Sequence, residues 1–270
     1  MFRTIVVPLD RSDRAEAAVP HAAALARQAG ARLQLLTIRP ASLDAATVRY
    51  RLHDIADRYE VDAELVVAGP DEVAVRLAEV AARPGTLLCL RTHARGPVAE
   101  MVMGSVSEQV VRTSERPVLM VGPLCTLPPE RYDSIVVGLD GSELAEQILP
   151  TVGSWSTQLG LTPWLFQALS PHVPFEVSGD MRETSYVHRR AVQLTIEGIE
   201  AEWDTAHDRD AAAAIVRCAK EHQPALVALT THGRSGLGRM ALGGVAFRVA
   251  HQATCPVLVL RPAGTPTTQK

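Results

Sequence analysis

The stretch THGRSGLGRMALGGVAFRVAHQATCPVLVLRP, from Thr231 to Pro262, decides the fold. Glycines crowd its first half, and its last residues form an apolar run of the kind found in buried strands. The stretch THARGPVAEMVMGSVSEQVVRTSERPVLMVGP, from Thr92 to Pro123, aligns with it without a gap, so that Thr92 corresponds to Thr231 and Pro123 to Pro262. The chain therefore contains two copies of one unit, although the two copies do not share all their glycines.

The beginning of the unit is repeated as well. TIVVPLDRS (Thr4–Ser12) matches SIVVGLDGS (Ser134–Ser142), so that Thr4 corresponds to Ser134 and Ser12 to Ser142. The second copy thus holds about nine additional residues, because corresponding residues lie farther apart in the later match than in this one. SPHVPFEVSGDMRETS (Ser170–Ser185) contains two prolines, a glycine and many polar residues, which predicts a loop that holds the insertion.

The link between the copies is predicted in GPLCTLPPERYD (Gly122–Asp133), because this segment has three prolines. We predict a first domain over residues 1–125, a linker over 126–133, a second domain over 134–263 and a tail over 264–270.

The composition indicates a globular protein with a substantial core. Of the 270 residues 47% are hydrophobic and 21% are charged, and the net charge is −3. This balance argues against a disordered chain and against a nucleic-acid-binding protein, which would carry a strongly basic face. No apolar run approaches the roughly 18 residues of a membrane helix, and the four cysteines form no disulfide or zinc pattern. We therefore expect a cytoplasmic protein with no membrane or nucleic-acid partner.

In both copies, apolar runs that predict buried strands alternate with segments that predict helices. The predicted strands are TIVVPL, ARLQLLTI, VDAELVVA, TLLCLR and RPVLMVG in the first copy, and residues near 134–139, 161–168, 199–204, 224–230 and 256–261 in the second. The helices predicted in the first copy cover residues 14–28, 43–59, 71–82 and a segment from Ser105. The alternation predicts an α/β fold: two doubly wound, mainly parallel five-stranded sheet domains in tandem.

The glycine segment has the chemistry of an anion site. In an open parallel sheet, ligands bind beyond the carboxyl ends of the strands. The last helix begins there, and its first N–H groups and positive dipole end favour a phosphate. Asp10 and Asp140 end the first strand of each copy, where a carboxylate suits ribose hydroxyls. The residues thus predict a nucleotide cleft in each half.

These residues resemble the universal stress protein family, in its tandem two-domain type. The resemblance covers nearly the whole chain and rests on IVVPLD, IVVGLD, THGRSG, CPVLVL and RPVLMV. It implies a Rossmann-like sandwich of the adenine nucleotide alpha hydrolase-like kind. It also implies that the last strands, Pro117–Val121 and Pro256–Leu260, pair antiparallel within the chain, as the equivalent edges do across dimers of the family.

The resemblance also implies a motif for ATP, Gly-x2-Gly-x9-Gly-[Ser/Thr], at the glycine segments. Its positions in the second half are Thr230, Gly233, Gly243 and Gly244, followed by Val245. Its positions in the first half are Arg91, Ala94, Gly104 and Ser105. Each half departs from the motif, in complementary places.

The second half is the better candidate for a nucleotide. It keeps the two inner glycines, which admit a close approach of the backbone, and it carries Arg239 where the first half carries Glu100. In the first half, Arg91 either fills space that ribose or phosphate would use or reaches a phosphate with its guanidinium.

Several of these residues also have a structural alternative. Ser105 opens SVSE, a capping box with Glu108, and Gly244 is a tolerable N-cap. Asp10 and Asp140 can equally cap the helices that follow the first strands.

Other candidates have mainly structural interpretations. His93 and His232 recur at the same place, as hydrogen-bonded turn residues would. HDRD (His207–Asp210) looks like a metal cluster but lies where a helix should begin, which favours a cap. RYRLHDIADRYE (Arg49–Glu60) predicts a solvated helix face.

No phosphate-binding lysine loop, nucleophile elbow or metal-ligand spacing is present in the sequence, so we expect no enzyme. Three hypotheses remain: a nucleotide-responsive stress or signalling regulator, an adaptor of the same fold that binds partners but no nucleotide, and a slow ATPase. The first implies ATP or another adenine nucleotide, with Mg²⁺ as its companion ion. The resemblance further implies a homodimer of tandem units and an unidentified protein partner.

Overall fold

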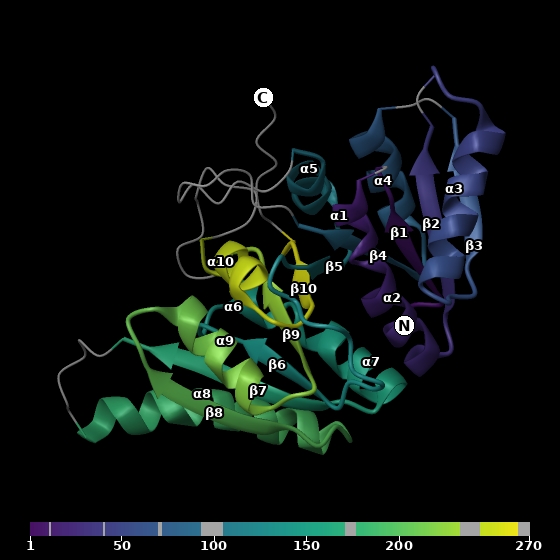
Figure 1. Ribbon diagram of the computed structural model, residues 1–270. Helices are drawn as coiled ribbons and strands as arrows, with labels where there is room; N and C mark the ends of the chain where they lie inside the picture. Colours follow the sequence, from purple (N-terminus) through teal and green to yellow (C-terminus); the bar gives the residue numbers. More distant parts are fainter. Residues whose placement is uncertain are drawn as a thin grey trace.

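The computed structural model describes residues 1–10, 12–39, 41–69, 72–92, 105–170, 177–232 and 244–263, without the side chains of residues 105 and 177–185. These residues form one ten-stranded sheet with helices on both faces (Figure 1).

The first half contains five strands and five helices among its described residues: β1 (Thr4–Pro8), α1 (Asp13–Glu16), α2 (Val19–Ala29), β2 (Arg32–Ile38), α3 (Ala45–Arg58), β3 (Glu64–Ala68), α4 (Val73–Ala82), β4 (Thr86–Arg91), α5 (Ser105–Thr113) and β5 (Val118–Val121).

The described residues of the second half repeat this order: β6 (Ser134–Gly138), α6 (Glu143–Glu146), α7 (Leu149–Leu159), β7 (Thr162–Leu169), α8 (Val177–Ile196), β8 (Glu202–His207), α9 (Ala211–Glu221), β9 (Ala225–Thr230), α10 (Gly244–Gln252) and β10 (Val257–Leu260).

The strand order is β3-β2-β1-β4-β5-β10-β9-β6-β7-β8. All neighbours are parallel except β5 and β10, which pair antiparallel with Leu119 opposite Leu258. The predicted α/β fold and the predicted pairing of the last strands within the chain are thus confirmed. The pairing removes the two apolar edges that separate halves would expose.

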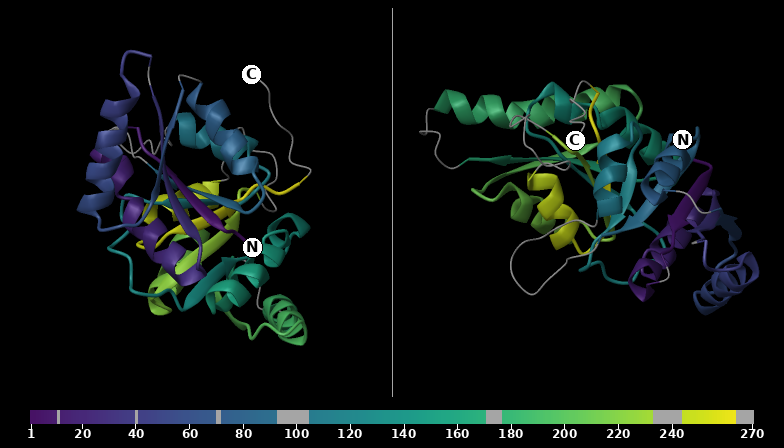
Figure 2. Two further views of the ribbon diagram at one scale, coloured as in Figure 1. Left: turned by 90° about the vertical axis from the view of Figure 1, so that its right-hand side faces the viewer. Right: turned by 90° about the horizontal axis from the view of Figure 1, so that it is seen from above.

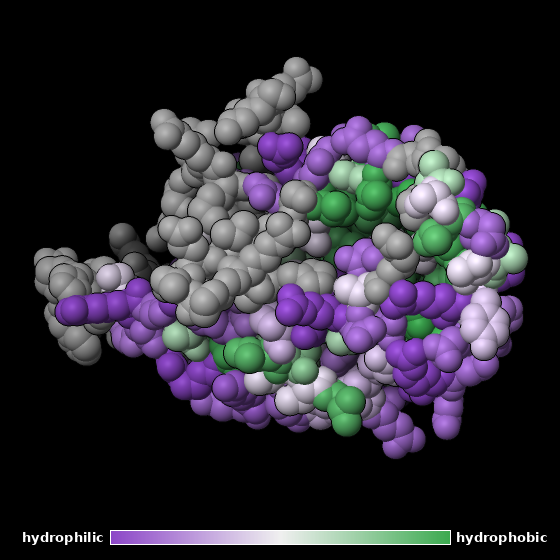
Figure 3. All heavy atoms as spheres, turned by 45° about the horizontal axis from the view of Figure 1, so that its top comes forward, coloured by the Kyte–Doolittle hydropathy of each residue, from purple (hydrophilic) through white to green (hydrophobic). Residues whose placement is uncertain are grey.

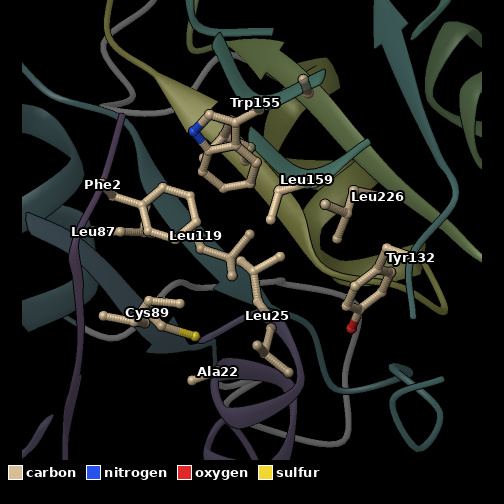
Figure 4. Close-up of a cluster of buried hydrophobic side chains, with 14 of the residues drawn as sticks. Phe2, Ala22, Leu25, Leu87, Cys89, Leu119, Tyr132, Trp155, Leu159 and Leu226 are labelled. Carbon is tan, nitrogen blue, oxygen red and sulfur yellow. The ribbon is translucent and has the colours of Figure 1, made fainter. Parts of the chain in front are cut away.

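The helices divide between the two faces of the sheet (Figure 2). One face buries the apolar sides of α2, α3, α7 and α8, and the other buries those of α4, α5, α9 and α10. The first face has a core that both halves share around the β5–β10 pair (Figure 4). There Phe2 meets the ring of Trp155 edge to face at 5.0 Å, and Leu25, Leu119 and Leu159 belong to the same buried cluster.

We call this junction the seam: the β5–β10 pair, α2, α7 and residues 122–133. Residues 122–133 contain no helix or strand, yet Tyr132 among them is only 1% exposed. The boundaries at 125, 133 and 263 remain predictions, and residues 264–270 lie outside the described part.

The helix predicted over residues 14–28 is two helices. α1 ends at Glu16 and α2 begins at Val19, because Pro20 has no N–H to donate into a preceding turn. Pro150 divides α6 from α7 in the same way in the second half.

The loop predicted over residues 170–185 is partly helical, since α8 begins at Val177. No proline follows Pro174 in this segment, so a helix anchored by its packed residues from 186 onward can extend backward. The position of the insertion is nevertheless confirmed. β2 and β7 still correspond in the register that relates Thr4 to Ser134, whereas the buried residues Val48 and Val187 correspond in the register that relates Thr92 to Thr231.

The strand predicted near 199–204 begins three residues later, at Glu202. Gly198 adopts φ +88°, and the Ile199 amide donates to the Leu194 carbonyl (2.9 Å), which closes the end of α8. These residues terminate a helix and are therefore not available to the strand.

Candidate functional site

The strand order reverses between β1 and β4 in the first half and between β6 and β9 in the second. Ligands of doubly wound sheets bind beyond the carboxyl ends of the strands at such points. α1 and α6 each lie against the second strand of the pair, β4 and β9. Figure 3 shows the molecule turned so that its top comes forward. In this view hydrophobic side chains gather in a hollow on the side of the first half.

Asp10 and Asp140 occupy matching turns after β1 and β6. Asp10 Oδ1 accepts hydrogen bonds from the backbone amide (3.0 Å) and hydroxyl (2.6 Å) of Ser12. Asp140 Oδ1 accepts the same two bonds from Ser142, at 3.0 and 2.6 Å. Ser12 and Ser142 are the N-caps of α1 and α6, so the alternative that the two aspartates are themselves the caps is wrong.

The end of β9 forms a compact turn in the second half. Thr230 is 9% exposed, and its hydroxyl donates to the carbonyl of His232 (2.8 Å). Thr231 is 1% exposed, and its hydroxyl lies 2.9 Å from His232 Nδ1. His232 is therefore a hydrogen-bonded turn residue, as the sequence indicates, while His93 lies outside the described residues.

Arg91 stands in the first half where Thr230 stands in the second, and its side chain turns to the seam. Arg91 Nη1 donates to the carbonyl of Gly122. Burial lowers the pKa of the guanidinium, and its charge helps lower the pKa of the buried His21. In this arrangement Arg91 contacts the residue directly after β5, and its hydrogen bond is to protein.

The helices that follow the glycine segments begin at equivalent positions, α5 at Ser105 and α10 at Gly244. Gly244 and Val245 are exposed, and a Cβ placed on Gly244 would meet no atom within 4 Å. Within the described part of the chain, the first residues of α10 are thus accessible. The remaining predicted positions (Ala94, Gly104, Gly233 and Gly243) and the side chain of Ser105 lie outside the described residues.

The HDRD segment is a helix cap, as the sequence favours. Asp210 is the N-cap of α9, and its Oδ1 accepts from the Ala213 amide (3.1 Å). Hydrogen bonds and the nearby Arg217 and Arg248 lower the pKa values of Asp208 and Asp210. Within the ranges that the structure describes, no three His, Cys, Asp or Glu side chains are grouped so that they could hold a metal ion.

The sequence analysis missed a carboxylate that is paired with arginine in each half, Glu16, which is buried, and Glu146, which is partly buried. Glu16 is 2% exposed and accepts from Arg58 Nη1 (2.6 Å), and Glu146 accepts from Arg190 Nη2 (2.6 Å). The helix α3 is therefore not simply a solvated face, since Arg58 reaches inward and Leu52 is buried. The register that relates Asp10 to Asp140 also relates Glu16 to Glu146, and this signal could have found the pair.

None of the described helices is both long and apolar enough to span a bilayer.

Comparison with known proteins places the sequence and the fold in one group. The universal stress protein family model matches residues 1–63, 44–122 and 131–261. A universal stress protein of Mycobacterium tuberculosis (strain ATCC 25618 / H37Rv) is 28% identical over 216 residues, which are 76% of this chain and 71% of that protein.

Two solved structures share the whole tandem fold. A universal stress protein from Archaeoglobus fulgidus DSM 4304 matches with a TM-score of 0.69 and 16% identity, over 96% of this chain and 98% of its own. A functionally unknown protein from Pseudomonas aeruginosa PAO1 matches with a TM-score of 0.67 and 19% identity, over 97% and 93%. At these identities the likeness concerns the fold alone.

Proposed function

Since the chain belongs to the universal stress protein family, we propose that it is a nucleotide-responsive stress or signalling regulator. An adenine nucleotide, ATP or a relative of it, binds at the strand ends of the second half. The observation that carries this proposal is the start of α10, where Gly244 and Val245 are exposed and where, among the residues that the structure describes, nothing lies within 4 Å of a Cβ placed on Gly244. A helix start of this kind offers backbone N–H groups to phosphate.

The residues of the second half fit such a ligand as follows. The amides of Gly244 and Val245 would hold phosphate oxygens, and Asp140 would accept from ribose hydroxyls. Thr230 occupies the first motif position with a small side chain whose hydroxyl is turned back to His232. Mg²⁺ would accompany ATP through its phosphate oxygens.

The first half is the weaker candidate, because Arg91 stands at the first motif position and is hydrogen-bonded to Gly122. This observation also supports the second candidate function, an adaptor that uses the fold to bind partners without a nucleotide. The two functions differ in one measurable property, the presence of one nucleotide per chain.

The test is titration calorimetry with ATP and AMP on two matched variants. Gly244→Asp places a carboxylate at the start of α10, and Ser105→Asp places one at the same position of α5. Acidic residues near a helix start do not disfavour the helix, so both variants should stay folded. We expect one site per chain, an affinity about tenfold or more weaker in Gly244→Asp through repulsion of phosphate, and no change in Ser105→Asp.

Two results would contradict the proposal. Failure of the wild-type protein to bind ATP, ADP or AMP at millimolar concentration would favour the adaptor. Loss of binding in Ser105→Asp alone would move the nucleotide to the first half.

We further propose that bound ATP acts by occupancy and is hydrolysed slowly or not at all. Phosphoryl transfer needs a positioned nucleophile and neutralisation of charge at the γ-phosphate. Neither glycine segment contains a lysine. A phosphate-release rate of about 1 s⁻¹ or more, typical of kinases, that disappears in Asp140→Ala would instead establish an enzyme.

A further inference from the structure

A cavity of about 170 Å³ lies in the first half between α1 and α3. Its apolar walls include Leu9, Val48, Leu52 and Ile55, none of which is more than 5% exposed. Its volume is close to that of an engineered apolar cavity, about 150 Å³, that binds benzene. The cavity is therefore large enough for one aromatic ring.

One side of this cavity carries a buried carboxylate. Glu16 is 2% exposed and lines the cavity together with Arg51 and Thr47. Arg58 Nη1 donates to Glu16 Oε2 (2.6 Å), and Arg51 Nη2 lies 3.6 Å from Oε1. A ligand in the cavity would thus meet a carboxylate that can accept a hydrogen bond, beside walls that are largely apolar.

The second half shows what fits against this carboxylate. Glu146, the counterpart of Glu16, accepts a hydrogen bond from the hydroxyl of Tyr186 (2.9 Å). Arg190, the counterpart of Arg51, donates to the two oxygens of Glu146 from Nε (2.9 Å) and Nη2 (2.6 Å). In this half, a phenol group of the protein itself is therefore hydrogen-bonded to the carboxylate.

The two helices α3 and α8 correspond residue by residue in the register that relates Thr92 to Thr231. The buried residues Val48, Leu52 and Ile55 of α3 match the buried residues Val187, Ala191 and Leu194 of α8.

The residue that matches Tyr186 is Thr47. Its side chain has no ring, and its hydroxyl donates to Asp44 Oδ2 (2.5 Å) at the start of α3. The first half thus has no ring at the position of Tyr186. The cavity lies beside Thr47 and Glu16, and Tyr59, at the end of α3, is not among the residues that line it.

We propose that the first half binds one small monocyclic aromatic molecule in this cavity, with a hydroxyl or amine that donates a hydrogen bond to Glu16. The class is that of phenols and aromatic amines, the chemistry of the Tyr186 side chain. The site does not depend on the proposed nucleotide site, because that site lies at the strand ends of the second half and all residues that line this cavity belong to the first.

The experiment is titration of the full chain with phenol, followed by calorimetry or by ligand-detected NMR. We expect one phenol per wild-type chain. Benzene has the same shape but no donor, and it should bind about tenfold more weakly, because a hydrogen bond to a charged group is absent.

Two variants exchange the residues between the halves. Thr47→Tyr supplies the missing ring and should weaken phenol binding at least tenfold. Tyr186→Thr removes the ring beside Glu146 and should raise the stoichiometry from one phenol to two. Circular dichroism and melting curves establish that each variant is folded. The two variants test the proposal in opposite directions, so a failure of one to fold leaves the other decisive.

Three results would overturn the proposal: no phenol binding to the wild-type chain at millimolar concentration, unchanged binding in folded Thr47→Tyr, or displacement of phenol by saturating AMP. The last result would make the cavity part of the strand-end cleft, and it is distinct from a failure of the nucleotide itself to bind.

Discussion

At the scale of single residues, one carboxylate oxygen of Asp10 and of Asp140 holds the turn that begins α1 and α6. The recurrence of Asp in both copies therefore has a structural cause that is independent of any ligand. A ligand role must be tested with a substitution that keeps this turn. Asparagine does so, because its Oδ1 accepts the same two hydrogen bonds without the charge.

For Asp140→Asn we expect an almost unchanged free energy of unfolding and an ATP affinity about fivefold weaker. The loss reflects the smaller value of a neutral hydrogen bond to ribose compared with a charged one. Asp10→Asn is the matched control and should not change the affinity. Urea unfolding and calorimetry measure the two properties, and equal effects of both variants on affinity would count against a second-half site.

His21 makes the stability of the protein depend on pH. Its Nδ1 lies 3.0 Å from the hydroxyl of Tyr132, and burial, assisted by the charge of Arg91, lowers its pKa from 6.5 to about 4. Between these values the unfolded chain binds a proton that the folded chain does not. The contribution of His21 is thus fully present above pH 6.5 and is lost as the pH falls toward 4.

We expect this loss to be about 3 kcal/mol. It is measured by urea unfolding at pH 7.5, 5.5 and 4.5 for the wild-type chain and for His21→Gln, which has no titrating ring. As the pH falls, protonation of carboxylates lowers the free energy of unfolding of both proteins. The difference between the two curves therefore reports the titration of His21 alone. Parallel curves for the two proteins would show that His21 titrates normally.

At the scale of elements, the close approach of β5 and α10 depends on one glycine. A Cβ on Gly122, directly after β5, would lie 2.1 Å from the carbonyl oxygen of Ala250 in α10. Backbone atoms of a packed helix cannot yield as a flexible side chain would. The end of β5 would have to move away from the seam.

Gly122→Ala should therefore lower the free energy of unfolding by about 1–3 kcal/mol, the usual cost of overpacking. Gly69→Ala is the control, since a Cβ there meets nothing within 4 Å. Its effect should be within about 0.5 kcal/mol. Denaturant unfolding compares the two variants. An equally small effect of both would mean that β5 and α10 accommodate the added methyl group without cost.

At the scale of the whole molecule, Gln28 of α2 ties the two halves together. Its Nε2 donates to the carbonyls of Tyr132 (2.7 Å) and Leu159 (2.8 Å), and its Oε1 accepts from the Tyr132 amide (2.9 Å). One side chain of α2 thus binds three backbone groups of Tyr132 and Leu159, in the parts of the seam that lie opposite α2.

Gln28→Leu keeps the apolar part of the side chain and removes all three hydrogen bonds, although the Leu159 carbonyl still accepts one from Arg131 Nη2 (3.2 Å). We expect a loss of about 2 kcal/mol in unfolding free energy, because groups buried without a hydrogen bond are costly. Gln193→Leu on α8, whose amide donates to Glu197 one turn away at an exposed site, is the control and should cost far less. Comparable losses of unfolding free energy in the two variants would show that the hydrogen bonds of Gln28 do not stabilise the contact between the halves.

The assembly of the chain is a prediction from the family resemblance. Because β5 and β10 already pair with each other, a second copy would have to use another surface. We expect a dimer of tandem units, with a light-scattering mass of twice the 29.1 kDa chain. A mass near 29.1 kDa over a broad concentration range would show a monomer.

The sequence by itself determined the architecture of both halves. Strands buried on two faces require continuous apolar runs, and TIVVPL, TLLCLR and their counterparts locate β1, β4, β6 and β9 to within a residue or so. The repeat also indicated where the strand ends meet, because the carboxyl ends of parallel strands share one edge. It did not indicate that Ser12 is the cap of α1, since Asp and Ser are both good capping residues and lie two positions apart.

Only the tertiary structure decided which residues of the two copies meet. His21 and Tyr132 are 111 residues apart, and Gln28 and Leu159 are 131 apart. Tyr186 donates a hydrogen bond to Glu146 in the second half, whereas a cavity lies beside Glu16 in the first. Local patterns report which face of an element is buried. The partner on that face depends on how the elements pack, and this follows from the shapes of all the side chains at the junction.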